Sequence, residues 1–312
     1  MARGSFRAAD GTRLAYRDDG DGQPVLALAG LTRDGRDFDY LARHLGEGVR
    51  LVRLDSRGRG GSDWADPETY TVAQEAQDAL ALLDHLGIER AAVIGSSRGG
   101  LLAMVMAATA PGRVAGICFN DVGPVLQREG LARIGTYMGV KPAVRTLEEV
   151  ADRSPAANPG FGNVPELRWE EEAIRHFIQT EEGLDLPYDP ALRVGFDRAM
   201  AGPLSDAWPL FDGCAGLPLA LIHGANSDVL TRETADEMQA RRPDLILHLA
   251  AVVSGEAEVL ARPQAAGRSL EPAQHRVALQ AVLRVVQPVR VVGVRDDVAH
   301  RQLGEPLSGP AH

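Results

Sequence analysis

The chain has few cysteines and few aromatic residues, and it lacks the long apolar runs of a membrane protein. Its two cysteines, Cys118 and Cys214, each stand beside an apolar run, which favours buried free thiols over a disulfide. Two cysteines among 312 residues favour a reducing compartment. No segment reaches the roughly 18 apolar residues of a membrane helix, and the N-terminus has no apolar signal core. The sequence therefore predicts a soluble cytoplasmic protein.

Positive charge and cofactor motifs are also scarce. Lysine and arginine number 33 against 43 aspartates and glutamates, so the net charge is -10. Because an acidic surface repels phosphate backbones and anionic lipids, we expect no nucleic-acid or membrane partner. H-E-x-x-H, Cys-x-x-Cys and a helix-opening G-x-G-x-x-G are absent, so we predict neither a metal nor a dinucleotide cofactor. Segment 55–63 is rich in glycine and arginine but lacks the Gly-Lys-Ser/Thr ending of a phosphate-binding loop. The expected partner is a small molecule; the oligomeric state stays open.

Apolar runs that alternate with helical patterns are present along most of the chain. Apolar runs of this length, closed by glycine or polar residues, are typical of strands buried on both faces of a parallel sheet. The strands are expected at 24–30, 49–54, 91–95, 114–119, 217–224 and 245–253, after a hairpin at 4–18. The helices are expected at 37–46, 72–86, 98–110, 231–241 and 273–286. This alternation predicts an α/β fold with a mostly parallel sheet flanked by helices.

The alternation is interrupted between residues 125 and 212. That stretch holds amphipathic helical segments and several prolines but no strand signal. Because ligands of such folds bind at the carboxyl ends of the strands, a helical insertion there predicts a cap over the site. We therefore expect a core formed by 1–124 and 213–287, a helical cap at 125–212, and a poorly ordered tail at 288–312.

A serine stands where an expected strand meets an expected helix. Gly95-Ser96-Ser97-Arg98-Gly99 fits the pattern G-x-S-x-G, between the apolar run 91–94 and a helical segment. A sharp strand-to-helix turn would hold Ser97 in strained geometry, and glycines on either side would remove Cβ clashes. The Ser97 hydroxyl would then be exposed at the helix N-terminus, where the Arg98 amide can stabilise a developing oxyanion. Ser96 would point the other way and is the weaker nucleophile candidate.

The serine motif and the strand–helix alternation together make the sequence resemble the α/β-hydrolase superfamily. Within that superfamily it looks most like small bacterial esterases and lactonases with a helical cap. The matching segments are 26–38, 51–63, 87–100, 119–124 and 217–230. The resemblance implies an oxyanion hole formed by the backbone amides of Leu31 and Arg98. Relatives usually have histidine where this chain has Ala29. Because the donors are main-chain groups, this change removes a supporting hydrogen bond and leaves the hole itself possible.

The resemblance also implies an acid and a base that follow the serine in the chain. Asp228, just past the strand at 217–224, stands where the acid orients the catalytic histidine. Asp121 is an alternative acid. The base should precede the final helix, which Glu271-Pro272 opens, but residues 263–267 contain no histidine. Among the remaining histidines, His275 in the first turn of that helix is the candidate base, although a solvated helix residue is the simpler interpretation. His223 and His248 fall in expected strands, and His300 and His312 fall in the expected tail.

The missing histidine leaves two hypotheses. The chain is a serine-dependent hydrolase of small esters or lactones that works through an acyl-enzyme, with Ser97, Asp228 and His275 as its triad. Alternatively, the base was lost or the reading frame shifted after about residue 247, which would leave at most a ligand binder. A cofactor-free C–C hydrolase or a perhydrolase would use the same triad.

Two further features carry open alternatives. The Arg98 side chain could meet a substrate carboxylate, although packing under the cap or solvation is the simpler interpretation. Six large side chains of the expected cap could line an apolar acyl pocket or pack helices together. They are Tyr137, Met138, Trp169, Phe177, Tyr188 and Trp208.

Overall fold

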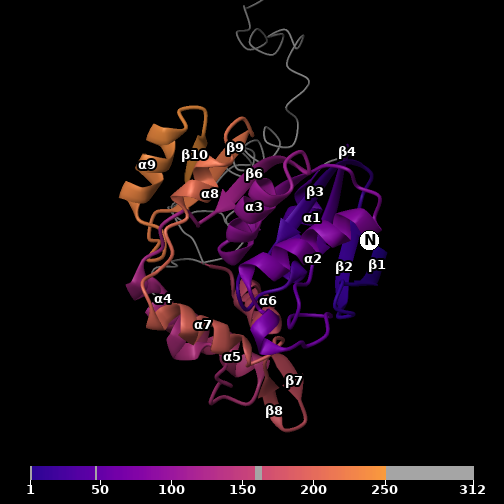
Figure 1. Cartoon of the computed structure of the whole chain (residues 1–312). Coiled ribbons are helices and arrows are strands. Elements are labelled where there is room, and N and C mark those ends of the chain that lie inside the picture. Colours follow the sequence, from indigo (N-terminus) through magenta and orange to yellow (C-terminus); the bar gives the residue numbers. More distant parts are fainter. Residues whose placement is uncertain (1, 46–47, 159–163, 251–312) are drawn as a thin grey trace, which may run out of the picture.

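The computed structural model describes residues 2–45, 48–158 and 164–250. Within these ranges eight strands form one sheet in the order β1-β2-β4-β3-β5-β6-β9-β10 (Figure 1). The strands are β1 (Ala2–Arg7), β2 (Arg13–Asp19), β3 (Gly22–Leu28), β4 (Gly48–Leu54), β5 (Ala91–Ser96), β6 (Val114–Asn120), β9 (Leu219–Gly224) and β10 (Ile246–Ala250). β1 and β2 pair antiparallel, β2 joins β4 antiparallel, and the remaining pairs are parallel. The predicted α/β fold with a mostly parallel sheet is confirmed.

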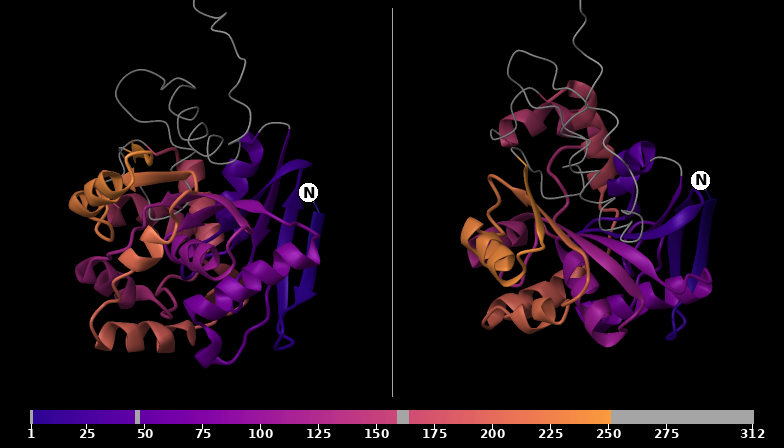
Figure 2. Two further views of the ribbon diagram at one scale, coloured as in Figure 1. Left: turned by 45° about the horizontal axis from the view of Figure 1, so that its top comes forward. Right: turned by 90° about the horizontal axis from the view of Figure 1, so that it is seen from above.

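Helices cover both faces of this sheet (Figure 2). The core helices are α1 (Asp39–His44), which follows the 3-10 turn η1 (Gly35–Phe38), α2 (Val72–His85), α3 (Arg98–Thr109), α8 (Trp208–Asp212) and α9 (Arg232–Arg241). Consecutive strand residues point to opposite faces. Val93 therefore packs in the larger hydrophobic cluster with α2 and α3, whereas Ile94 packs in the smaller cluster with α1. Burial on both sides explains why the strands read as continuous apolar runs.

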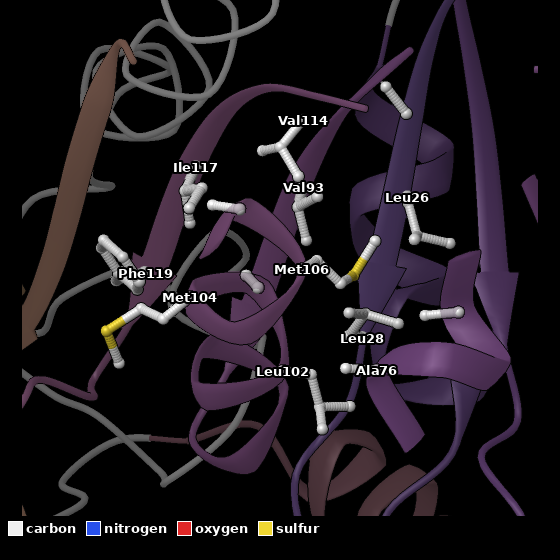
Figure 3. Close-up of a cluster of buried hydrophobic side chains, with 14 of the residues drawn as sticks. Leu26, Leu28, Ala76, Val93, Leu102, Met104, Met106, Val114, Ile117 and Phe119 are labelled. Atoms are coloured by element: carbon white, nitrogen blue, oxygen red, sulfur yellow. The ribbon is translucent and has the colours of Figure 1, made fainter. Parts of the chain in front are cut away.

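The larger cluster joins the central strands to α3. Side chains of β3, β5 and β6 meet those of α3 and α2 in Figure 3, among them Leu28, Val93, Phe119 and Leu102. All four side chains are fully buried. Burial of a side chain of this size contributes about 1.5–3 kcal/mol relative to leaving it exposed. α3 is therefore held firmly against the strand whose end carries Ser97.

The segment between β6 and α8 forms a separate group of elements at one end of the molecule (Figure 1). It contains α4 (Arg128–Tyr137), α5 (Leu147–Ala157), α6 (Glu166–His176), the antiparallel pair β7 (Ile178–Thr180) and β8 (Gly183–Asp185), and α7 (Leu192–Ala201). No strand was expected there. The two strands have three residues each, and β7 is exposed throughout, so neither a period-two pattern nor an apolar run reveals them.

Backbone hydrogen bonds tie this segment to the loop after β4. Gly60 N donates to Pro187 O at 2.9 Å, and Asp189 N donates to Gly58 O at 2.8 Å. Arg59 and Tyr188 form an antiparallel bridge between them. The loop follows the carboxyl end of β4, so the inserted segment is fastened at the strand ends where ligands of parallel sheets bind. The domain limits given above stay a prediction.

The two cysteines are free and buried, as predicted. Among the described residues, no helix has the length and apolar character needed to cross a membrane. The predicted final helix and tail lie outside the described residues.

Candidate active site

Ser97 occupies a strained turn between β5 and α3. Its backbone has φ 49° and ψ −116°, in the left-handed half of conformational space that non-glycine residues rarely adopt. The amide of Ser97 donates to Asn120 O at 3.0 Å, and its carbonyl accepts from Gly100 N at 2.9 Å. Ser97 is partly exposed. The predicted strand–turn–helix arrangement around Ser97 is therefore present.

The flanking glycines make this turn possible. A Cβ on Gly99 would lie 2.0 Å from Leu28 O, and a Cβ on Gly95 would lie 2.4 Å from Gly100 N. Either contact is shorter than atoms tolerate, and the atoms concerned belong to the backbone. The start of α3 thus packs directly against the end of β3, which leads into the loop carrying Leu31.

Ser96 has a structural environment. Its side chain is fully buried, and its Oγ lies 3.0 Å from Asn120 Nδ2, which donates to it. The hydroxyl therefore supports the pairing of β5 with β6. This placement agrees with the expectation that Ser97, rather than Ser96, faces outward.

The Arg98 side chain is held by the protein itself. Its Nε and Nη2 donate to the carboxylate of Glu75 at 3.0 and 2.7 Å, and Nη2 also donates to Tyr70 O at 3.0 Å. The guanidinium is thus paired in a mostly buried position, neither solvated nor awaiting a substrate carboxylate. The Arg98 amide belongs to the first residue of α3, so no carbonyl within the helix can accept from it.

Leu31 lies in the loop after β3, next to the Ser97 turn. Gly30 O accepts from Arg33 N at 3.2 Å, and Leu31 O accepts from Arg59 Nε at 2.8 Å. Leu28 pairs with Gly95 across β3 and β5, so the loop and the turn leave the same edge of the sheet. The proposed oxyanion residues Leu31 and Arg98 therefore follow neighbouring strands.

The strand register also brings the two candidate acids to this edge. Ser96 pairs with Asn120, and Asn120 pairs with Ile222, so these three residues lie side by side across β5, β6 and β9. Ser97 and Asp121 each follow directly after a residue of this set. Asp228 lies a few residues further, between β9 and α9.

The two carboxylates differ in environment. Asp228 Oδ2 lies 3.1 Å from Arg133 Nη2, in a pair whose side chains are 37% and 73% exposed. Asp121 is buried, has φ 52°, and accepts a 3.0 Å hydrogen bond from Gly224 N. Burial raises the pKa of Asp121, although the Gly224 amide and the Ser227 hydroxyl oppose that rise. Asp228 is thus the accessible carboxylate, and Asp121 braces the turn after β6.

Two histidines of the described region, His223 and His248, lie on strands of the sheet. The imidazole of His223 is buried, with Nε2 3.0 Å from Leu230 O. A carbonyl accepts, so Nε2 carries the proton, and Nδ1 has no partner among the described residues. His248 lies on β10, where burial lowers its pKa. His275 lies outside the described residues, so the base stays a prediction.

Part of the expected apolar lining gathers near Leu31. Leu31 packs against a cluster that includes Met138 and Tyr188, with Phe177 beside it. The other three large side chains lie elsewhere: Trp169 packs with α5, Trp208 meets Phe211 edge to face, and Tyr137 is 54% exposed. No group of three or more metal-ligating side chains occurs within the described ranges.

Two residues near the site were not predicted from the sequence. Glu75 and Arg59 are fully buried and charged, and they pair with each other at 3.2 Å. The sequence does indicate that Glu75 is buried. Glu75 precedes Leu82 by seven residues, which is about two helical turns, so both residues lie on the buried face of α2. A charged residue on that face requires a buried partner. The sequence offers several arginines, so the partner is identified by the structure.

Comparison with known proteins agrees with this architecture. A family model described as the alpha/beta hydrolase fold matches residues 23–134. The chain is 38% identical to the 3-hydroxybutyrate-oligomer hydrolase of Cupriavidus necator, over an alignment covering 73% of this chain and 82% of the relative. It is 28% identical to the 2-(acetamidomethylene)succinate hydrolase of Mesorhizobium japonicum, covering 74% and 81%.

A solved structure extends the match to the fold. The crystal structure of an alpha/beta hydrolase from Novosphingobium aromaticivorans superimposes with a TM-score of 0.80 at 35% identity, covering 91% of this chain and 98% of the other. The resemblance inferred from the sequence is thereby confirmed. The chain belongs to the alpha/beta hydrolase fold family.

Proposed function

We propose that this protein hydrolyses small esters or lactones through an acyl-enzyme on Ser97. The observation that carries the proposal is the strained turn of Ser97, with φ 49° between two glycines that admit no side chain. Such strain is costly and persists where the surrounding structure enforces it. Its consequence here is a partly exposed serine at the edge of the sheet. The similarity to enzymes named as hydrolases supports a hydrolase that acts on ester bonds.

The proposed reaction has two halves. The Oγ of Ser97 attacks the carbonyl carbon while its proton passes to the base, and the carbonyl oxygen becomes an oxyanion held by the amides of Leu31 and Arg98. Collapse of this intermediate breaks the ester C–O bond, and the leaving alkoxide takes the proton from the base. Water then attacks the acyl group by the same route, which releases the acid and restores Ser97. His275 is the proposed base, and Asp228 is proposed to orient it.

The proposed substrates are short and largely apolar on the acyl side. Leu31 packs against a cluster that contains Met138 and Tyr188, and Phe177 packs against the same cluster, so an acyl chain next to the oxyanion hole would meet apolar surface. The relative from Cupriavidus necator is named for 3-hydroxybutyrate oligomers. We therefore propose short oligoesters of hydroxy acids as the first substrates to test, with a simple lactone as the comparison.

A fluorophosphonate probe together with p-nitrophenyl acetate tests the nucleophile. We expect the wild-type protein to be labelled and to release p-nitrophenol, and Ser97→Ala to lose the labelling and nearly all turnover. Loss of a triad serine costs several orders of magnitude in kcat, on the order of 10⁶. Ser96→Ala is the matched control, because it removes the adjacent, buried hydroxyl and should keep the labelling.

The same experiment separates the two hypotheses. Labelling that survives in Ser97→Ala would assign the nucleophile elsewhere. A folded wild-type protein with neither labelling nor turnover would contradict the hydrolase and support the ligand binder that lacks a base.

A further inference from the structure

A buried charge network joins the two residues whose amides are proposed to hold the oxyanion. Glu75 lies in the first turn of α2 and is 1% exposed. Its Oε1 lies 2.7 Å from Arg98 Nη2 and 3.2 Å from Arg59 Nη1, and Oε2 accepts from Arg98 Nε at 3.0 Å. One carboxylate therefore links α2 both to the residue after the nucleophile and to the loop after β4.

Arg59 carries this link on to Leu31. Its Nε donates to Leu31 O at 2.8 Å. On the other side of the Leu31 Cα, Gly30 O accepts from Arg33 N at 3.2 Å. The Leu31 N–H belongs to the planar Gly30–Leu31 peptide group, so it points away from the fixed Gly30 carbonyl. Hydrogen bonds thus hold both peptide groups that flank Leu31.

The charges in the network keep Glu75 ionised. Burial alone would raise the pKa of Glu75, but the positive charges of Arg59 and Arg98 hold that pKa below its usual value. Burial also lowers the pKa of Arg59, and the charge of Glu75 opposes this change. Two guanidinium groups share one carboxylate, so the network has one net positive charge beside the candidate oxyanion hole.

We propose that Glu75 is a positioning residue, which through Arg98 and Arg59 aligns the backbone amides of Arg98 and Leu31 for the oxyanion. This inference rests on the proposed function in that it takes those two amides as the oxyanion donors. A positioning role and a purely electrostatic role predict opposite changes in reaction rate when the Glu75 charge is removed. Removal of the Glu75 charge would add net positive charge near an oxyanion, which by itself would speed the reaction. A slower reaction therefore indicates lost alignment.

Glu75→Gln with Asp78→Asn as the matched control tests the alignment. Asp78 lies on the same helix, is 1% exposed, and holds Arg57 of the same loop at 2.6 and 2.8 Å. Both variants therefore neutralise a buried carboxylate, but the carboxylate of Asp78 pairs with Arg57, whereas that of Glu75 pairs with Arg59 and Arg98. With p-nitrophenyl acetate, we expect Glu75→Gln to lower kcat by about 10²-fold, as loss of an oxyanion donor does. KM should stay near the wild-type value, and Asp78→Asn should change neither constant substantially.

A second measurement works without turnover. In the full-length chain, the ¹H–¹⁵N amide resonances of Leu31 and Arg98 should both move in Glu75→Gln and stay in place in Asp78→Asn. Unmoved resonances in a folded Glu75→Gln, or an unchanged or higher kcat, would overturn the proposal. If the wild-type protein proves inactive, the resonances still decide the role of Glu75, while the proposed function fails separately.

Arg59→Lys covers the case in which Glu75→Gln does not fold. Lysine keeps the charge, but its single Nζ replaces the separate Nε and Nη1 of Arg59, so it can reach Glu75 or Leu31 O and not both. The Leu31 amide resonance should then move in Arg59→Lys and stay at its wild-type position in Asp78→Asn. An unmoved Leu31 resonance in Arg59→Lys would likewise overturn the proposal.

Discussion

At the scale of single residues, the site contains two aspartates with different chemical settings. Asp228 is 37% exposed and pairs with an arginine that is itself mostly exposed. Such surface pairs are weak, so an imidazole can replace Arg133 beside this carboxylate. With Asp228 as the acid, we expect Asp228→Asn to lower kcat by about 10⁴-fold, because the imidazole loses its orientation and its charge partner. Steady-state turnover of p-nitrophenyl acetate measures this loss.

Asp121→Asn is the control for that substitution, since an amide oxygen still accepts from Gly224 N. It should keep most of the activity. Because burial raises the pKa of Asp121, its protonated form is the one that the fold favours. Its contribution to stability is therefore greatest at low pH and falls as pH rises from the ordinary carboxyl range to the raised pKa. Asp121→Asn should lack this pH dependence. A large loss of kcat in Asp121→Asn with none in Asp228→Asn would make Asp121 the acid.

At the scale of secondary-structure elements, α3 depends on its packing against the central strands. Leu102 is fully buried in the larger cluster beside Leu28 (Figure 3). We expect Leu102→Ala to lower the free energy of unfolding by about 2–5 kcal/mol, because it leaves a cavity in a packed core. Urea denaturation followed by circular dichroism measures the change. Leu167→Ala on α6, where the side chain is 63% exposed, should shift stability by less than about 0.5 kcal/mol. Equal losses in the two variants would contradict this account of the core.

The same contrast explains what could be predicted from sequence. Strands β3, β5 and β6 are buried on both faces, so an apolar run identifies them without knowledge of their neighbours. The turn at Ser97 was predictable because two glycines and a serine at fixed spacing follow such a run. The pair β7–β8 was missed because each strand has only three residues and β7 is exposed throughout, which is too short a stretch to leave a pattern. The partners of Glu75 were missed because an ion pair between α2 and two loops depends on the folded arrangement.

At the scale of the whole molecule, the inserted segment is fastened to the core beside the candidate site. The hydroxyl of Tyr70 donates to Asp189 Oδ2 at 2.6 Å and accepts from Ala65 N at 2.9 Å. Burial, together with the charge of Asp189, raises the pKa of Tyr70 to about 12, so the hydroxyl stays protonated and remains a donor. Asp189 in turn accepts from Ala191 N just before α7. Tyr70 therefore connects the core to the segment between β8 and α7 of the insertion.

Tyr70→Phe removes this hydroxyl and leaves a buried carboxylate oxygen and an amide without their partner. We expect amide hydrogen exchange across 186–192 to become faster by about one to two orders of magnitude, since a hydrogen bond to a charged group contributes about 1.5–3 kcal/mol. Mass spectrometry of the exchanged peptides measures the change, and β5 and β6 should keep their protection. Tyr16→Phe is the control, because the Tyr16 hydroxyl lies 3.3 Å from Nε2 of His85, a residue of the core helix α2. Exchange that rises equally in both variants, or throughout the sheet, would mean that Tyr70 supports general stability rather than the junction between core and insertion.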